Sequence, residues 1–180
     1  MKKISVSQIA MCGVMAALVA IGTSVIRVPI NVTGGYVHLG DSLVYISGIL
    51  FGPIFGGISA ALGSFIADML GYPLYAVPTF IIKGLDAFVV GAIYMKTGAK
   101  TNNMTKKIIS YIVAFLAGGV VMVSGYYIFE SYMYGFQTAI LAVIPNVIQA
   151  VVGGLLGLPL FLAMERSGMM KTLKKSFVSK

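Results

Sequence analysis

Long apolar segments follow one another through almost the whole chain, interrupted mainly by short stretches that contain glycine, proline or charge. Of the 180 residues, 58% are hydrophobic and only 10% are charged, whereas roughly 25% of the residues of an ordinary soluble domain are charged. A soluble protein of this size leaves roughly 30% of its surface in water, so it could not hide this much apolar surface. The sequence therefore predicts an integral membrane protein, and about 20 residues per crossing allow six or seven crossings.

Glycine and proline mark the ends of the predicted helices. Gly52 and Pro53 separate two apolar segments, Pro73 follows the end of the next one, and Pro78 suits the first turn of a further helix. We predict an all-α fold, an integral membrane bundle of six transmembrane helices in a single domain (1–180). The approximate helices are 4–26, 40–51, 54–70, 78–95, 108–129 and 138–164, with a polar loop at 31–38 and a basic loop at 96–107.

The lysine and arginine residues predict the orientation of this bundle. Six helices place both termini and the loop at 96–107 on one side, and eleven of the 13 lysine and arginine residues then lie there. The other side holds Arg27, Lys83 and four of the 5 acidic residues. Because positive residues are retained on the inner side of a membrane, we expect both termini in the cytoplasm.

Polar side chains gather in the outer half of the predicted bundle. An ionisable residue within a membrane costs about 2.5–3.5 kcal/mol, so a cluster of them indicates a function. Tyrosines offer flat amphipathic walls, and a few polar groups can orient a ligand. The pattern predicts an outward-facing pocket for a small, polar, ring-containing solute. The candidate substrate-binding residues are Tyr36, His38, Asp68, Tyr72, Tyr75, Thr79, Lys83, Asp86, Tyr126, Tyr127, Glu130, Asn146 and Gln149.

Structural roles for the same residues remain open alternatives. Lys83 and Asp86, on one face of the helix at 78–95, can pair with each other. Asn146 and Gln149 can hold helices together by hydrogen bonds. His38, in a loop, is expected to be solvated more often than to bind a ligand, and tyrosines near a membrane surface often form an interfacial belt.

The sequence lacks the motifs of an energy source or of a metal enzyme. It contains no G-x-x-x-x-G-K-[ST] phosphate-binding loop, and one histidine and one cysteine provide no credible zinc or haem site. We therefore expect no catalytic residues, no bound metal and no bound cofactor. A binding pocket in a chain without an ATP-binding motif implies a partner protein that supplies the energy. The small residues Gly13, Ala16, Ala17 and Ala20 allow close helix contact, either with that partner or inside the bundle.

Five segments resemble the S components of energy-coupling factor (ECF) vitamin transporters, most closely the riboflavin-transporter-like branch. The resemblance extends from the first predicted helix to the last. It is carried by 35–42 (GYVHLGDS), 50–57 (LFGPIFGG), 67–73 (ADMLGYP), 79–84 (TFIIKG) and 145–149 (PNVIQ). The HLGD and GYP segments differ from those of the riboflavin-specific members, which disfavours riboflavin as the substrate.

The resemblance implies a six-helix protein in the plasma membrane of a prokaryote that captures a vitamin at its outer face. Such a protein works with a transmembrane coupling subunit and two cytoplasmic ATPase subunits, which use the ATP. Ala16 and Ala20 match the family's contact with the coupling subunit. Lys83 and Asn146 would be hydrogen-bond partners of the ligand. Tyr36, Tyr72 and Tyr75 would form the lid or wall of the pocket.

The favoured function is capture of a water-soluble vitamin or precursor, with hydroxymethylpyrimidine or pyridoxine ahead of riboflavin or pantothenate. One alternative is a self-sufficient small transporter or channel that acts as a homo-oligomer. Another is a membrane-embedded enzyme acting on a lipid-linked substrate, for which Asp41 and Asp68 are the only candidate acid pair.

Overall fold

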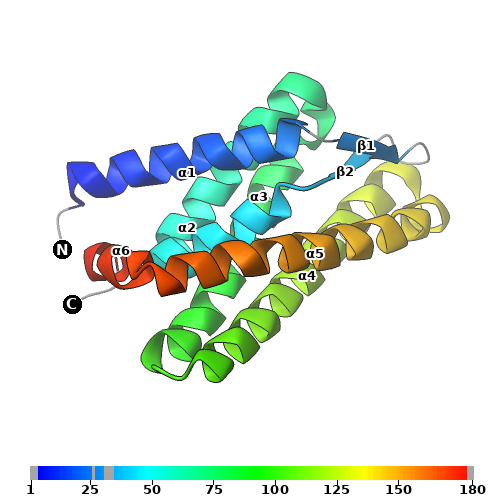
Figure 1. Cartoon of the computed structure of the whole chain (residues 1–180). Helices are drawn as coiled ribbons and strands as arrows, with labels where there is room; N and C mark the ends of the chain where they lie inside the picture. The colour runs from blue at the N-terminus through cyan, green and yellow to red at the C-terminus, as the bar shows by residue number, and fades with distance from the viewer. Residues whose placement is uncertain (1–3, 26, 31–34, 178–180) are drawn as a thin grey trace.

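The computed structural model describes residues 4–25, 27–30 and 35–177. Figure 1 shows a bundle of long helices with one small hairpin of strands. Residue 26, the last of the first predicted helix, lies outside the described part. The elements are α1 (Val6–Val25), β1 (Arg27–Ile30), β2 (Gly35–His38), α2 (Asp41–Gly71), α3 (Pro73–Lys96), the 3-10 helix η1 (Gly98–Lys100), α4 (Met104–Tyr134), α5 (Phe136–Arg166) and α6 (Met169–Phe177).

Five of the described helices, α1 to α5, are long and apolar enough to cross a membrane. The short α6 has only 9 residues. Large apolar side chains such as Val120, Ile128 and Ile144 lie on the outer surface of the bundle. A surface of this kind suits hydrocarbon rather than water. The predicted membrane bundle is confirmed at this level.

Helix α2 consists of two halves that turn back on each other at Gly52. This residue has φ 78° and ψ −177°, a conformation that favours glycine because it lacks a Cβ atom, and Pro53 follows it. The Ser47 hydroxyl donates to the carbonyl oxygen of Gly56 at 3.0 Å, although nine residues of a straight helix would span about 13 Å. The predicted helices 40–51 and 54–70 correspond to these two halves.

The first half of α2 forms the centre of the bundle. Nearly every side chain between Asp41 and Phe51 is buried, as expected for a helix that is apolar on all sides. Tyr45 and Ile49 are fully buried, and the Tyr45 hydroxyl donates to the carbonyl oxygen of Ala150 in α5 at 3.3 Å. The other helices therefore surround this short segment.

Two short strands, which were not predicted from the sequence, lie between α1 and α2 in this otherwise helical chain. There, β1 and β2 pair as an antiparallel hairpin, with His38 opposite Arg27 and Tyr36 opposite Pro29. The predicted loop at 31–38 overlaps β2, and its residues 31–34 lie outside the described part. Branched and aromatic residues such as Val28 and Tyr36 favour extended backbone, and a proline is tolerated in an edge strand.

Several helix boundaries also differ from the prediction. Helix α3 begins at Pro73, in its first turn, so that Pro78 lies inside the helix instead of at its start. A proline inside a membrane helix is tolerated where neighbouring groups satisfy the freed backbone. Helices α4 and α5 each have 31 residues and extend beyond the predicted 108–129 and 138–164.

The start of α1 and the short helix α6 lie at one end of the bundle, and the β1–β2 hairpin lies at the opposite end (Figure 1). We call these the terminal end and the hairpin end. At the terminal end, the Lys107 ammonium pairs with Glu165, which also accepts a hydrogen bond from the Tyr94 hydroxyl at 3.0 Å. Phe177 of α6 packs there on Phe51, with ring centroids 4.5 Å apart.

Candidate functional site

A small polar cavity lies beneath β2 at the hairpin end. The centre of a water-sized sphere can move through about 20 Å³ of it, so it holds little more than one or two water molecules. The known pockets for small ligands are far larger, about 300–1,000 Å³, so a ring-sized ligand requires the lining to move. The lining residues are Tyr36, His38, Asp68, Tyr75, Tyr126, Glu130, Asn146 and Gln149. All eight are among the candidates predicted from the sequence.

Tyr36 of β2 covers one side of this cavity. Its hydroxyl donates to Asp68 of α2, and its ring stacks on that of Tyr72 with centroids 4.4 Å apart. The Arg27 guanidinium lies 4.9 Å from the Tyr36 ring centroid and 5.8 Å from that of Tyr72. Burial raises the pKa of Tyr36, which keeps its hydroxyl protonated as a donor. The hairpin is thus fastened to the end of α2.

Two hydrogen-bonded pairs support the opposite wall. The Tyr75 hydroxyl of α3 donates to the Glu130 carboxylate of α4 at 3.1 Å. Thr79 and Tyr126 share a hydrogen bond between their hydroxyls at 3.0 Å. These pairs hold α3 against α4 and fix which polar atoms face the cavity.

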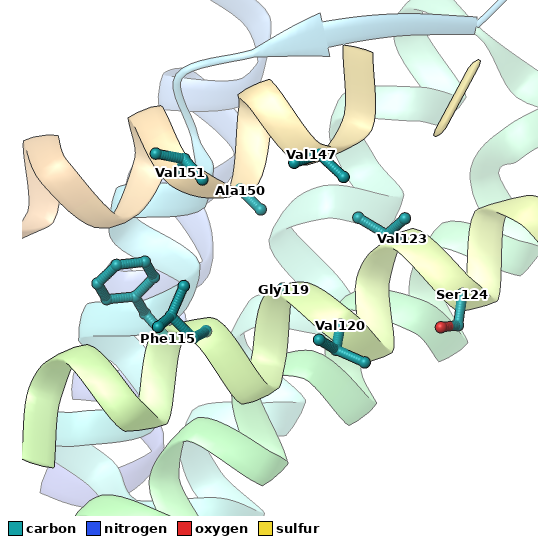
Figure 2. A pocket seen from close by; sticks show the side chains of 9 residues that line it. Phe115, Gly119, Val120, Val123, Ser124, Val147, Ala150 and Val151 are labelled. Atoms are coloured by element: carbon teal, nitrogen blue, oxygen red, sulfur yellow. The ribbon is translucent and has the colours of Figure 1, made fainter. Parts of the chain in front are cut away.

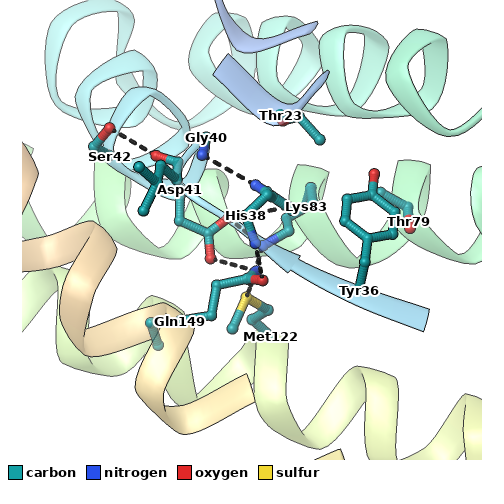
Figure 3. Close-up of polar contacts among 12 residues, drawn as sticks. Thr23, Tyr36, His38, Gly40, Asp41, Ser42, Thr79, Lys83, Met122 and Gln149 are labelled. Carbon is teal, nitrogen blue, oxygen red and sulfur yellow. Dashed lines mark hydrogen bonds and ion pairs between the residues drawn. The ribbon is translucent and has the colours of Figure 1, made fainter. Parts of the chain in front are cut away.

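A buried ion pair lies close to the cavity (Figure 3). The Lys83 ammonium of α3 pairs with Asp41 at the start of α2, and both side chains are fully buried. Gln149 of α5 donates from Nε2 to the second Asp41 oxygen at 2.9 Å. Lys83 also contacts the sulfur of Met122 in α4. This network joins four helices at one point inside the bundle.

His38 links the hairpin to the same network. Its backbone N–H donates to Oε1 of Gln149 at 2.8 Å, and its Nδ1 accepts a hydrogen bond from the Gly40 backbone N–H at 3.0 Å. The imidazole is buried, so the expectation of a solvated loop histidine is wrong. Burial lowers the pKa of His38 to about 4. The ring is therefore neutral at pH 7, with Nδ1 free of a proton.

The remaining predicted site residues lie outside the cavity lining. Lys83 pairs with Asp41 and not with Asp86, which corrects the alternative pairing considered from the sequence. Asp86 is fully buried, and its carboxylate makes no hydrogen bond to any residue in the described ranges. Tyr127 is only half-buried and packs near Phe136, with ring centroids 6.4 Å apart.

Asp41 is not among the binding residues predicted from the sequence. It lies at the first position of α2, directly after the loop, where an acid at a helix start has an ordinary structural explanation. Its partners Lys83 and Gln149 are 42 and 108 residues away in sequence. Its place within an apolar stretch was the only available signal, because a buried acid inside a membrane needs a partner.

A wider but almost entirely apolar groove lies between α4 and α5 (Figure 2). It measures about 200 Å³ and is open to the outside of the bundle. Apart from the Ser124 hydroxyl, its lining side chains provide nothing to orient a polar solute. We therefore assign the polar cavity, and not this groove, as the candidate site.

The four small residues of α1 divide between two faces. Ala16 is buried, and its backbone lies against Gly63 of α2. Gly13 and Ala17 are exposed, and Ala20 is half-buried. A Cβ atom added at Gly13 would meet no described atom within 4 Å. Only part of this stretch is therefore available to a partner.

A membrane-embedded helical bundle that encloses a polar, ionisable cavity is typical of transport proteins. Comparison with known families agrees with this class. The chain belongs to the family of the ECF-type riboflavin transporter S component, whose model matches residues 3–166. The resemblance noted from the sequence is thereby confirmed.

Two relatives illustrate the range of this similarity. One, described as an uncharacterized protein in a gap 3'region of Pyrococcus woesei, is 34% identical over 139 residues, which cover 77% of this chain and 88% of the relative. The other is the thiamine precursor transporter HmpT of Lactococcus lactis subsp. cremoris (strain MG1363). It is 29% identical over 144 residues, which cover 79% of this chain and 78% of the relative.

Proposed function

We propose that this chain is the substrate-capturing subunit of an ATP-driven ECF importer for a small water-soluble vitamin precursor. The convergence of eight polar and aromatic side chains around one cavity beneath β2 carries the proposal. They come from β2 and from four helices, so no local structural need explains their meeting. Hydroxymethylpyrimidine is the first candidate substrate and pyridoxine the second, ahead of riboflavin or pantothenate.

The chemistry of the cavity lining supports a small ring as the ligand. Tyr36, Tyr75 and Tyr126 supply flat surfaces on which a ring can stack. Asn146 is buried at the lining and makes no hydrogen bond with the described residues around it, so its amide can offer a donor and an acceptor to a heterocycle. A narrow cavity opens more readily for one ring than for the three fused rings of riboflavin. The similarity to a thiamine precursor transporter favours a pyrimidine.

The mechanism we propose is capture followed by transport that a partner drives. The hairpin moves away, the ligand enters, and Tyr36 closes over it by renewing its contacts with Asp68 and Tyr72. A transmembrane coupling subunit then docks on the exposed face of α1 that carries Gly13 and Ala17. Two cytoplasmic ATPase subunits hydrolyse the ATP. This chain itself performs no chemistry and binds no cofactor.

We further propose that the chain crosses the plasma membrane of a prokaryote six times. The two halves of α2 turn back on each other at Gly52, and the surrounding helices bury the short first half. This arrangement accounts for the start of α1 and the helix α6 lying at one end of the bundle. Lysines at 96, 100, 106 and 107 belong to the connection at that end, and the retention of positive residues on the inner side of a membrane supports cytoplasmic termini. The hairpin end then faces outward.

Mass spectrometry of the small molecules released from the purified, detergent-solubilised chain tests the proposal. We expect about one vitamin-type heterocycle per chain, lost in Asn146→Ala, which removes an amide from the cavity lining. Asn102→Ala is the matched control, because Asn102 is an exposed loop residue far from the hairpin end. A wild-type chain that releases no such compound, and also binds none from a panel of added vitamins, would contradict the proposal.

A further inference from the structure

We infer that the cavity beneath β2 selects neutral or cationic heterocycles that carry hydrogen-bond donors, and that it rejects anionic forms of the same ring, such as phosphate esters. The inference rests on the proposed function, because it concerns the ligand of the same cavity. Among the described residues, the lining contains the carboxylates of Asp68 and Glu130 and no lysine or arginine side chain. Each of these two carboxylates is only 2% exposed.

Side chains of the cavity wall already donate their protons to neighbouring carboxylates. They therefore offer a ligand hydrogen-bond acceptors rather than donors. Tyr36 gives its hydroxyl proton to Asp68, and Tyr75 gives its proton to Glu130. Gln149 donates to Asp41. These groups can still accept hydrogen bonds from a ligand through their oxygen atoms. A phosphate or carboxylate needs several donors and would find few here.

The basic groups nearby are already committed to other partners. The Lys83 ammonium is paired with Asp41. The Arg27 guanidinium donates to the Ala67 carbonyl oxygen at 2.9 Å and to the Ser24 hydroxyl at 3.0 Å, and it lies against the ring of Tyr36. The imidazole of His38 is neutral, as described above. The Lys83 charge is thus neutralised by its ion pair, and the hydrogen bonds of Arg27 hold its guanidinium outside the cavity lining.

Asn146 is independent evidence that the cavity receives a ligand of this kind. Its side chain is 5% exposed and lines the cavity, and a buried amide normally has hydrogen-bond partners. An amide pairs well with the edge of an aminopyrimidine, where a ring nitrogen accepts and an exocyclic amine donates. The carboxylates can then take a second donor of the same ring. The cavity therefore suits a heterocycle whose hydrogen-bonding edge carries a neutral or protonated amine.

The test compares matched pairs of compounds on the purified full chain by isothermal titration calorimetry. The pairs are hydroxymethylpyrimidine with its phosphate, and pyridoxine with pyridoxine 5′-phosphate. Where a pair binds, we expect the unphosphorylated compound to bind at least about tenfold more tightly than its phosphate ester. Placing like charges together in a buried site is strongly unfavourable. Equal or tighter binding of the phosphate ester would overturn the inference while leaving the proposed function intact.

Two isosteric variants locate the selectivity. Glu130→Gln and Asp68→Asn each remove one negative charge at almost constant size, and each is expected to narrow the affinity ratio within a pair several-fold. Glu165→Gln removes an acid at the terminal end and should leave the ratio unchanged. An unchanged ratio in both cavity variants would overturn the inference. Binding of neither member of either pair would instead contradict the proposed function, and this inference with it.

Discussion

At the scale of single residues, the ion pair of Asp41 and Lys83 is the most costly feature of the site. Both side chains are fully buried in an apolar bundle, where an uncompensated charge costs several kcal/mol. The pair is held by Gln149 on one side and Met122 on the other. Each buried charge is thus compensated only as long as the other residue is present.

Removing one partner of this pair is therefore expected to be more harmful than removing both. Asp41→Asn or Lys83→Met alone should each cost about 3–5 kcal/mol of stability, whereas the double variant should recover a large part of the loss. Thermal unfolding of the three purified variants in detergent measures this coupling. Losses that simply add in the double variant would show that the two charges do not depend on each other.

His38 makes the hairpin sensitive to acid. Burial lowers the pKa of its imidazole to about 4 in the folded protein, against about 6.5 when exposed. Below pH 6.5 the exposed form takes up a proton that the buried form does not. The stability of the closed hairpin is therefore complete above about pH 6.5 and falls as the pH decreases towards 4.

Between pH 7 and pH 5, this effect should lower the stability of the wild-type chain by on the order of 2 kcal/mol. Protonated Nδ1 could no longer accept the hydrogen bond from Gly40. Thermal unfolding at the two pH values, compared with His38→Gln, isolates the contribution of the imidazole. The variant should lose clearly less stability on acidification, and an equal loss in both proteins would count against this role.

At the scale of elements, close contact between α2 and α3 depends on small residues. A Cβ atom at Gly91 would lie 2.7 Å from the Gly48 carbonyl oxygen and 2.8 Å from the nitrogen of Pro53. These are backbone atoms, which cannot yield as a flexible side chain would. The turn of α2 at Gly52 is thus held in place by α3.

Gly91→Ala should accordingly destabilise the bundle by about 1–3 kcal/mol, the usual cost of overpacking. Gly13→Ala is the matched control, since a Cβ atom there meets nothing within 4 Å among the described atoms and alanine favours the helix. The melting temperatures of the two purified variants measure this difference in stability. A Gly91→Ala protein as stable as Gly13→Ala would contradict the tight packing of α2 on α3.

Local signals in the sequence predicted some elements better than others. The reversal at Gly52 and Pro53 could be predicted because both residues interrupt a helix within an apolar run. The β1–β2 hairpin could not, because each strand has only four residues and lacks a clear alternation of polar and apolar positions. The pairing of Lys83 with Asp41 instead of Asp86 depends on how α2 packs against α3, which no local pattern encodes.

At the scale of the whole molecule, polarity is distributed in the reverse of a soluble protein. Apolar side chains cover the outside of α1 to α5, and the ionisable residues Asp41, Lys83 and Asp86 are buried inside. The low charge content and the long apolar segments predicted the apolar outer surface, and the cost of ionisable residues in a membrane predicted the polar interior. The eight cavity residues could be predicted as a set because polar residues are expensive in a membrane, but the small size of their cavity could not.

The central claim is that this chain captures a vitamin precursor and relies on partner subunits to transport it. Binding and uptake of labelled hydroxymethylpyrimidine, measured side by side in cells that express the chain with or without the ATPase subunits, test it most directly. We predict saturable binding in both cases and uptake only when the ATPases are present. Uptake that persists without them, at the same rate, would contradict the account and favour a self-sufficient transporter.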